Sequence, residues 1–204
     1  MRKFGKALSG RKNLVKALDS QIHHEFSQYK YDEDVELFLN LYQLEMEDFA
    51  DTKKIVLKKS SKTHNLEINF ESKSPFSQKD LKILDSVSTE KITNNFCDFN
   101  VFITKIQNNS GLFFDCCSFK SELHIKSITF SNDMKKFETQ DESNFFYNGP
   151  DLEKFSPKIV DFFYNYLFEF GVDQDFCSFI ETYCVDKDYR LYMAWLQKVR
   201  SLFP

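Results

Sequence analysis

The sequence has little glycine and proline, with five and four of them among its 204 residues. So few chain-breaking residues argue against a fold dominated by loops. The chain also has no apolar run that approaches the ~18 residues of a transmembrane helix. It contains no P-loop, GxGxxG, HExxH or GxSxG motif, and these motifs mark nucleotide, zinc-protease and serine-hydrolase sites. We therefore expect no transmembrane segment, no bound cofactor and no enzymatic activity.

Acidic residues are missing from the first sixteen positions. Residues 1–16 carry six basic groups, and the rest of the chain has 21 basic and 31 acidic residues, a net charge of −10. The basic start resembles a mitochondrial presequence, the alternative being the solvated basic start of a helix. We assign residues 1–16 as a presequence or basic tail and residues 17–204 as a single domain. An acidic body binds nucleic acid poorly but attracts basic proteins.

By contrast, the sequence is rich in aromatic residues, and phenylalanine alone occurs 24 times. This composition argues against global disorder, and a chain of this length can bury a core without metal or disulfides. The five cysteines, an odd number, are expected as reduced thiols. Adjacent Cys116 and Cys117 would point to opposite faces of a strand, and adjacent His23 and His24 diverge on a helix. Neither pair suits a shared metal ion, so we expect no metal site.

Hydrophobic periodicity predicts one early helix and then a series of strands. Helical spacing covers residues 12–29, and a short helix or strand follows over 35–42. Up to seven strands are expected, at 43–49, 53–60, 65–72, 96–107, 111–120, 123–131 and 144–149. The second and third of these form a hairpin, and the polar residues 72–95 between the third and fourth indicate a long loop.

Capping residues mark three helices after the strands. Ser156 fits an N-cap, Pro157 the first helical position and Gly171 the C-terminal stop. Asp173 can cap a second helix over 174–185, and Asp186 can cap the last helix. Since strands and helices are segregated along the chain, we predict an α+β fold with a mostly antiparallel sheet.

The last 60 or so residues resemble a known family. The carrying features are the tyrosine-glycine strand end at 147–149, the helix closed by "GVD", the segment "FCSFIETY" and "YRLYMAWLQKVRSLF". They are similar to the C-terminal region of the mitochondrial acidic matrix protein family, also called the mitochondrial glycoprotein family. The upstream order of elements fits too, so the resemblance spans residues 12–203.

The resemblance implies a seven-stranded, highly twisted antiparallel sheet flanked by N-terminal and C-terminal helices, in a doughnut-shaped homotrimer of the mitochondrial matrix. It implies a non-catalytic, multi-ligand, scaffold- or chaperone-like protein tied to mitochondrial translation, ribosome or RNA-related assembly. Basic proteins, ribosomal ones among them, are the expected partners, with RNA bound at most indirectly.

Relatives often carry very acidic loops, whereas residues 72–95 hold three acids and four lysines. We therefore expect the partner-binding surface elsewhere, on the acidic residues Asp32, Glu33, Asp34, Glu36, Asp141 and Glu142.

The last helix has an unusually wide apolar arc. Its apolar residues cover roughly 200°, whereas an ordinary surface helix needs about 100°. The expected oligomer contacts are Tyr189, Tyr192, Leu196 and Val199, with Trp195 and Leu191 turned toward the protomer's own core or a second helix. The alternative is a helix packed wholly within the monomer, beside the N-terminal helix.

One rival function stays open, which is a carrier of small apolar ligands such as lipids. A curved antiparallel sheet gripped by a long helix can enclose an apolar cavity, and the many phenylalanines could line it.

Overall fold

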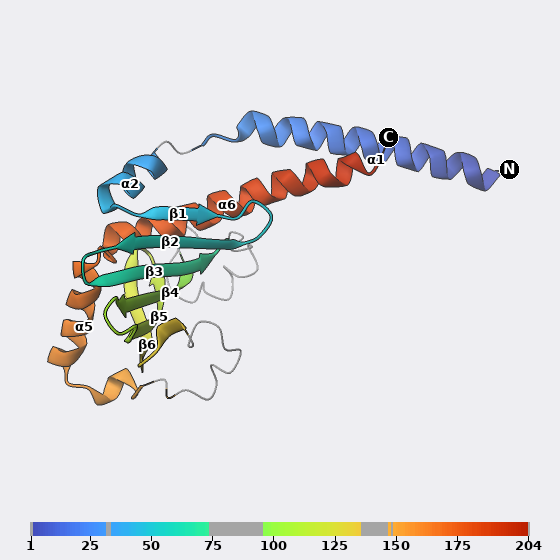
Figure 1. Cartoon of the computed structure of the whole chain (residues 1–204). Helices are drawn as coiled ribbons and strands as arrows, with labels where there is room; N and C mark the ends of the chain where they lie inside the picture. The colour runs from blue at the N-terminus through green and yellow to red at the C-terminus, as the bar shows by residue number, and fades with distance from the viewer. Residues whose placement is uncertain (1, 32–33, 74–95, 136–146, 148, 204) are drawn as a thin grey trace.

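A six-stranded antiparallel sheet forms the centre of the structure (Figure 1). The computed structural model describes residues 2–31, 34–73, 96–135, 147 and 149–203. The strands are β1 (Glu45–Asp48), β2 (Lys54–Ser60), β3 (His64–Glu71), β4 (Phe96–Lys105), β5 (Gly111–Phe119) and β6 (Glu122–Ser131). Each strand pairs with the next one in the chain, so the predicted α+β fold with an antiparallel sheet is confirmed.

Two sequence predictions fall on parts of the chain that lie outside the described residues. The expected seventh strand covers residues 144–149, of which only Tyr147 and Gly149 are described, and neither belongs to a strand. The expected long loop over 72–95 is described only at its first two residues.

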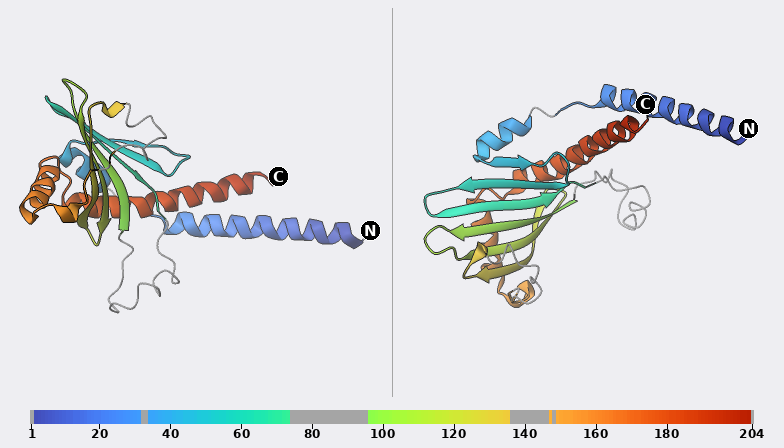
Figure 2. Two further views of the ribbon diagram at one scale, coloured as in Figure 1. Left: turned by 90° about the horizontal axis from the view of Figure 1, so that it is seen from below. Right: turned by 45° about the vertical axis from the view of Figure 1, so that its right-hand side comes forward.

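The helices are α1 (Arg2–Gln28), α2 (Asp34–Tyr42), α5 (Pro157–Glu169) and α6 (Gln174–Ser201), with a 3₁₀ turn, η2 (Leu152–Lys154), before α5. Both views in Figure 2 show α1 and α6 side by side, extending together past the edge of the sheet. Helix α1 therefore begins well before residue 12 and runs without a break through the boundary between residues 16 and 17.

The predicted break at Asp186 is wrong, because α6 is one helix of 28 residues. The Asp186 carboxylate does not cap a helix start. It accepts hydrogen bonds from the Tyr29 hydroxyl at 3.0 Å and from Arg190 Nε at 2.8 Å. An aspartate pairs well with an arginine four residues later on the same helix face, which explains how it fits into the interior of α6.

The boundaries of α5 and the start of α6 follow the sequence prediction, although the Ser156 side chain makes no capping hydrogen bond. Helix α5 begins at Pro157, and Gly171 just after it has a positive φ of 86°. A side chain at Gly171 would meet the Tyr42 ring at 2.9 Å, so glycine suits this stop on both counts. Asp173 then caps α6 by accepting a hydrogen bond from the Phe176 amide at 2.9 Å.

One face of the sheet packs against α6 and forms the core. Alternate residues of the central strands point to this face, among them the fully buried Ile68, Val101 and Phe114. Phe176 of α6 meets the ring of Phe99 edge-on, with centroids 5.6 Å apart. Aromatic rings thus fill the space between the helix and the sheet, where a lipid carrier would need a cavity.

A buried charge joins α6 to the first strands. The Lys187 side chain is 1% exposed, and its ammonium donates to the Asp48 carboxylate, to the Phe49 carbonyl at 3.2 Å and to the Lys54 carbonyl at 2.7 Å. These three acceptors replace the water that the ammonium loses on burial, which keeps the buried charge from being prohibitively costly.

Asp48 holds two further side chains of α6. Its carboxylate accepts from the Tyr183 hydroxyl at 2.6 Å and from Arg190 Nη2 at 2.9 Å. Burial alone would raise the pKa of Asp48, but hydrogen bonds from Lys187, Tyr183 and Arg190 outweigh it and leave the pKa below the ordinary value. The carboxylate is therefore ionised at neutral pH and pairs with both cations.

We expect Lys187→Met to lower the free energy of unfolding by about 3 kcal/mol, since removing one partner of a buried ion pair leaves the other without its compensation. The matched control is Lys198→Met on the same helix. Its ion pair with Asp51 is exposed and should contribute no more than ~1 kcal/mol. Urea denaturation measures both values, and similar small losses for the two variants would contradict the role given to Lys187.

Candidate interaction surfaces

Helices α1 and α6 form an antiparallel pair, which we call the helical hairpin. Arg200 Nε donates to Asp19 at 2.6 Å, and the Tyr189 hydroxyl donates to the Glu25 carboxylate. The rings of Tyr29 and Tyr189 stack with centroids 5.7 Å apart. Along this pair Leu18 of α1 and two apolar residues of α6, Met193 and Leu196, are buried. The contact thus combines an apolar seam with charged and aromatic pairs at its edges.

The four expected oligomer contacts on α6 are buried to different extents within the protomer. Leu196 is only 4% exposed, so its side chain is already covered within the protomer. Tyr189 and Val199 are half-buried, and Tyr192 is exposed. The structure therefore brings Tyr189 to α1, and the Tyr192 hydroxyl reaches Glu25 of α1 from the border of that contact.

Trp195 takes the orientation opposite to the expected one. It was expected to face the protomer's own core or a second helix, but its side chain is 57% exposed, and Leu202 is 74% exposed. Residues seven apart lie on nearly the same side of a helix, so these two form an outward apolar ridge, which we call the Trp195 ridge. The helical wheel gives the width of the apolar arc, but the choice of inward side depends on how α1 lies against α6.

The predicted acidic surface is described only in part. Asp34 and Glu36 lie exposed on α2. The other four predicted residues, Asp32, Glu33, Asp141 and Glu142, lie outside the described residues.

Residues of α2 and α6 line a hollow in which Asp34 is joined by two acids of α6. The sequence analysis did not predict this grouping. Asp175 and Asp186 come from the first half of α6, about 140 residues and more away in the sequence. The sequence predicts Asp186 as a helix cap, and Asp175 lies in the first turn of α6. No short-range signal in the sequence could have placed them beside α2.

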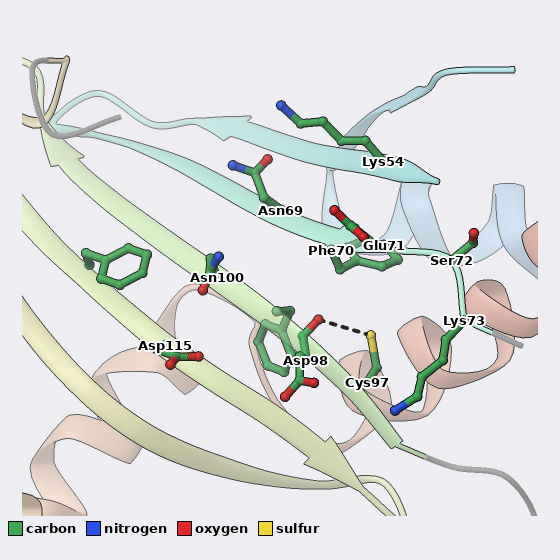
Figure 3. A pocket seen from close by; sticks show the side chains of 12 residues that line it. Lys54, Asn69, Phe70, Glu71, Ser72, Lys73, Cys97, Asp98, Asn100 and Asp115 are labelled. Carbon is green, nitrogen blue, oxygen red and sulfur yellow. Dashed lines mark hydrogen bonds between the residues drawn. The ribbon is translucent and has the colours of Figure 1, made fainter. Parts of the chain in front are cut away.

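The open face of the sheet carries a second hollow, of about 570 Å³ (Figure 3). Asn69, Asn100 and Asp115 lie directly opposite one another on β3, β4 and β5 and form a polar row across it. Lys126 bridges Asp98 and Asp115 at 2.9 and 2.8 Å. Two carboxylates held by one ammonium are poorly placed for acid–base chemistry.

The cysteines of the chain are free thiols. Cys97 and Cys184 are buried with their sulfur atoms 3.1 Å apart. The hydrogen bond to Cys184 and burial both raise the pKa of Cys97 far above the ordinary value, so this thiol does not ionise and is a poor nucleophile. Cys116 is buried on the core face, whereas its neighbour Cys117 is half-buried on the other face, as the strand pattern predicted.

The described residues include no candidate metal site and no candidate membrane-spanning helix. Within them, no group of three or more His, Cys, Asp or Glu side chains is arranged to hold a metal ion. Across the same ranges, none of the helices combines the length and apolar character that crossing a membrane requires.

Comparison with known proteins gives consistent matches. The family model described as mitochondrial glycoprotein (MAM33) matches residues 18–203. The mitochondrial acidic protein mam33 of Schizosaccharomyces pombe is 24% identical over 215 residues, which cover 94% of this chain and 78% of that protein.

Two solved structures share the fold. The Trypanosoma brucei p22 protein has a TM-score of 0.71 and 16% identity, covering 96% of this chain and 100% of that one. A Leishmania major protein of unknown function, described as a sequence homologue of human p32, has a TM-score of 0.69 and 18% identity, covering 94% and 98%. At such identities the likeness concerns the fold alone.

Proposed function

The chain belongs to the mitochondrial glycoprotein family, and on that premise we propose that it is a non-catalytic binding protein of the mitochondrial matrix whose partners are basic proteins. It acts as a scaffold or chaperone in mitochondrial translation, ribosome or RNA-related assembly. The name of the S. pombe relative, a mitochondrial acidic protein, supports the location and the acidic character.

The charge distribution is the observation that carries this proposal. After residue 16 the chain has 31 acidic residues against 21 basic ones. An acidic surface attracts basic proteins over a distance and repels phosphate groups. The partners among ribosomal components are therefore their basic proteins, and RNA is reached through those proteins.

Binding should weaken with salt, because exposed charges farther apart than about 8 Å are screened at physiological ionic strength. We expect a lysine- and arginine-rich peptide to bind the protein more tightly than a single-stranded RNA of similar length. Raising the salt from 50 to 300 mM should weaken the peptide complex by roughly tenfold, or about 1.4 kcal/mol. Fluorescence anisotropy with labelled peptide and RNA measures both, and equal affinities without salt dependence would contradict the proposal.

We further propose that the protein is a ring-shaped homotrimer joined through the helical hairpin. The Trp195 ridge supports this, since exposed apolar patches often mark protein interfaces. Tyr192 and Val199 border the ridge and contribute to the contact, whereas Tyr189 and Leu196 support it from inside the protomer.

Trp195→Asp should convert the trimer into folded monomers, because the side chain is exposed in the protomer and a charge in a packed apolar interface costs several kcal/mol. Gln197→Asp is the control, since it adds the same charge at an exposed position two residues away. Light scattering at micromolar concentration gives the mass of each variant. A monomeric wild type would contradict the trimer, and a Trp195→Asp variant that stays trimeric would contradict an interface at the Trp195 ridge.

A further inference from the structure

A groove lies between α2 and the first half of α6 and has a volume of about 240 Å³. Its lining combines apolar side chains with three carboxylates, and none of the nine residues is basic. They are Asp34, Val35, Phe38, Asp175, Ser178, Phe179, Thr182, Tyr183 and Asp186. We call this the α2–α6 groove. Small-molecule pockets usually measure about 300–1,000 Å³, so this groove fits a single side chain better than a whole metabolite.

The floor of the groove belongs to a column of four stacked rings. Phe38 stacks on Tyr42 at 4.3 Å and on Phe179 at 4.1 Å, and Phe179 stacks on Tyr183 at 5.6 Å between centroids. The two outer rings are fixed by their hydroxyls, since Tyr42 donates to Asp173 at 3.1 Å and Tyr183 donates to Asp48 at 2.6 Å. The aromatic surface is therefore formed before any partner arrives, which lowers the entropic cost of binding.

The chain itself shows which cation this surface accepts. The Arg190 guanidinium lies over the Tyr183 ring, 5.4 Å from its centroid, and its Nε donates to Asp186 at 2.8 Å. One end of the ring column thus already binds a guanidinium between an aromatic face and a carboxylate. At the other end of the groove, Asp175 is exposed and contributes a carboxylate beside Phe179.

We propose that the α2–α6 groove binds an arginine side chain from a basic partner protein, with the alkyl part on the Phe38–Phe179 surface and the guanidinium beside Asp175. The inference rests on the proposed function and identifies one place where it is carried out. Arginine fits better than lysine because its planar guanidinium pairs with a carboxylate through two parallel hydrogen bonds, which an ammonium cannot do. The carboxylates at the rim repel phosphate, which argues against RNA or an anionic membrane as the occupant.

The test compares two labelled peptides of equal length and charge, one rich in arginine and one rich in lysine, on three proteins. The wild type should bind the arginine peptide more tightly. Asp175→Asn should weaken that peptide roughly tenfold and remove most of its advantage over the lysine peptide. Asp161→Asn is the control, because it removes the same charge at an exposed position of α5, away from the groove, and it should leave the arginine preference unchanged.

The outcomes separate this inference from the function on which it rests. Equal binding of the two peptides by the wild type would overturn the groove proposal, and so would equal weakening by both aspartate substitutions. Either result leaves the general binding of basic proteins intact. If neither peptide binds any of the three proteins at low salt, the proposed function fails together with the groove. Thermal melting of both variants confirms that they are folded before binding is compared.

Discussion

The buried ammonium of Lys187 fixes the position of α6 against the sheet. It contacts Asp48 at the end of β1 and two backbone carbonyls, one of them on β2, so any sliding or rotation of the helix would leave a charge without acceptors. Asp48 extends this constraint to Tyr183 and Arg190, and Asp186 extends it to Tyr29, which directly follows α1. The helical hairpin and the ring column of the groove are both anchored on this cluster.

Both proposed surfaces therefore depend on one continuous helix. The α2–α6 groove uses α6 residues from Asp175 to Asp186, and the Trp195 ridge begins nine residues later. At 1.5 Å per residue, the centres of the two surfaces are about 25 Å apart along the helix. Subunit contact and partner binding can thus occur at the same time. In the proposed ring each subunit would present its own groove, and linked sites bind a multivalent basic partner more tightly than single ones.

The sequence predicted the features that depend on local pattern. Alternating residues identified all six described strands, and Pro157, Gly171 and Asp173 marked the helix boundaries correctly. The resemblance of the last 60 or so residues identified the family, which the match over residues 18–203 confirms. The strand pattern and the helix boundaries can be predicted because each depends on residues within a few positions in the chain.

Features that depend on distant contacts could not be predicted. Asp186 has the sequence context of a helix cap, but it pairs with Arg190 four residues later and also accepts from Tyr29, which lies 157 positions away. The position of α1 determines that Trp195 faces outward. The α2–α6 groove is formed by α2 and a helix from the other end of the chain. A helical wheel contains no information about such partners.

Native-state hydrogen exchange along α6 tests the anchoring of this helix most directly. If the buried cluster holds α6 as part of the core, amides from Phe176 to Met193 should exchange only through global unfolding, at the same free energy as the slowest amides of β4. The contrary result would be exchange of these α6 amides through an opening of much lower free energy while β4 stays protected. That result would mean that α6 detaches from the sheet and cannot hold either surface in place.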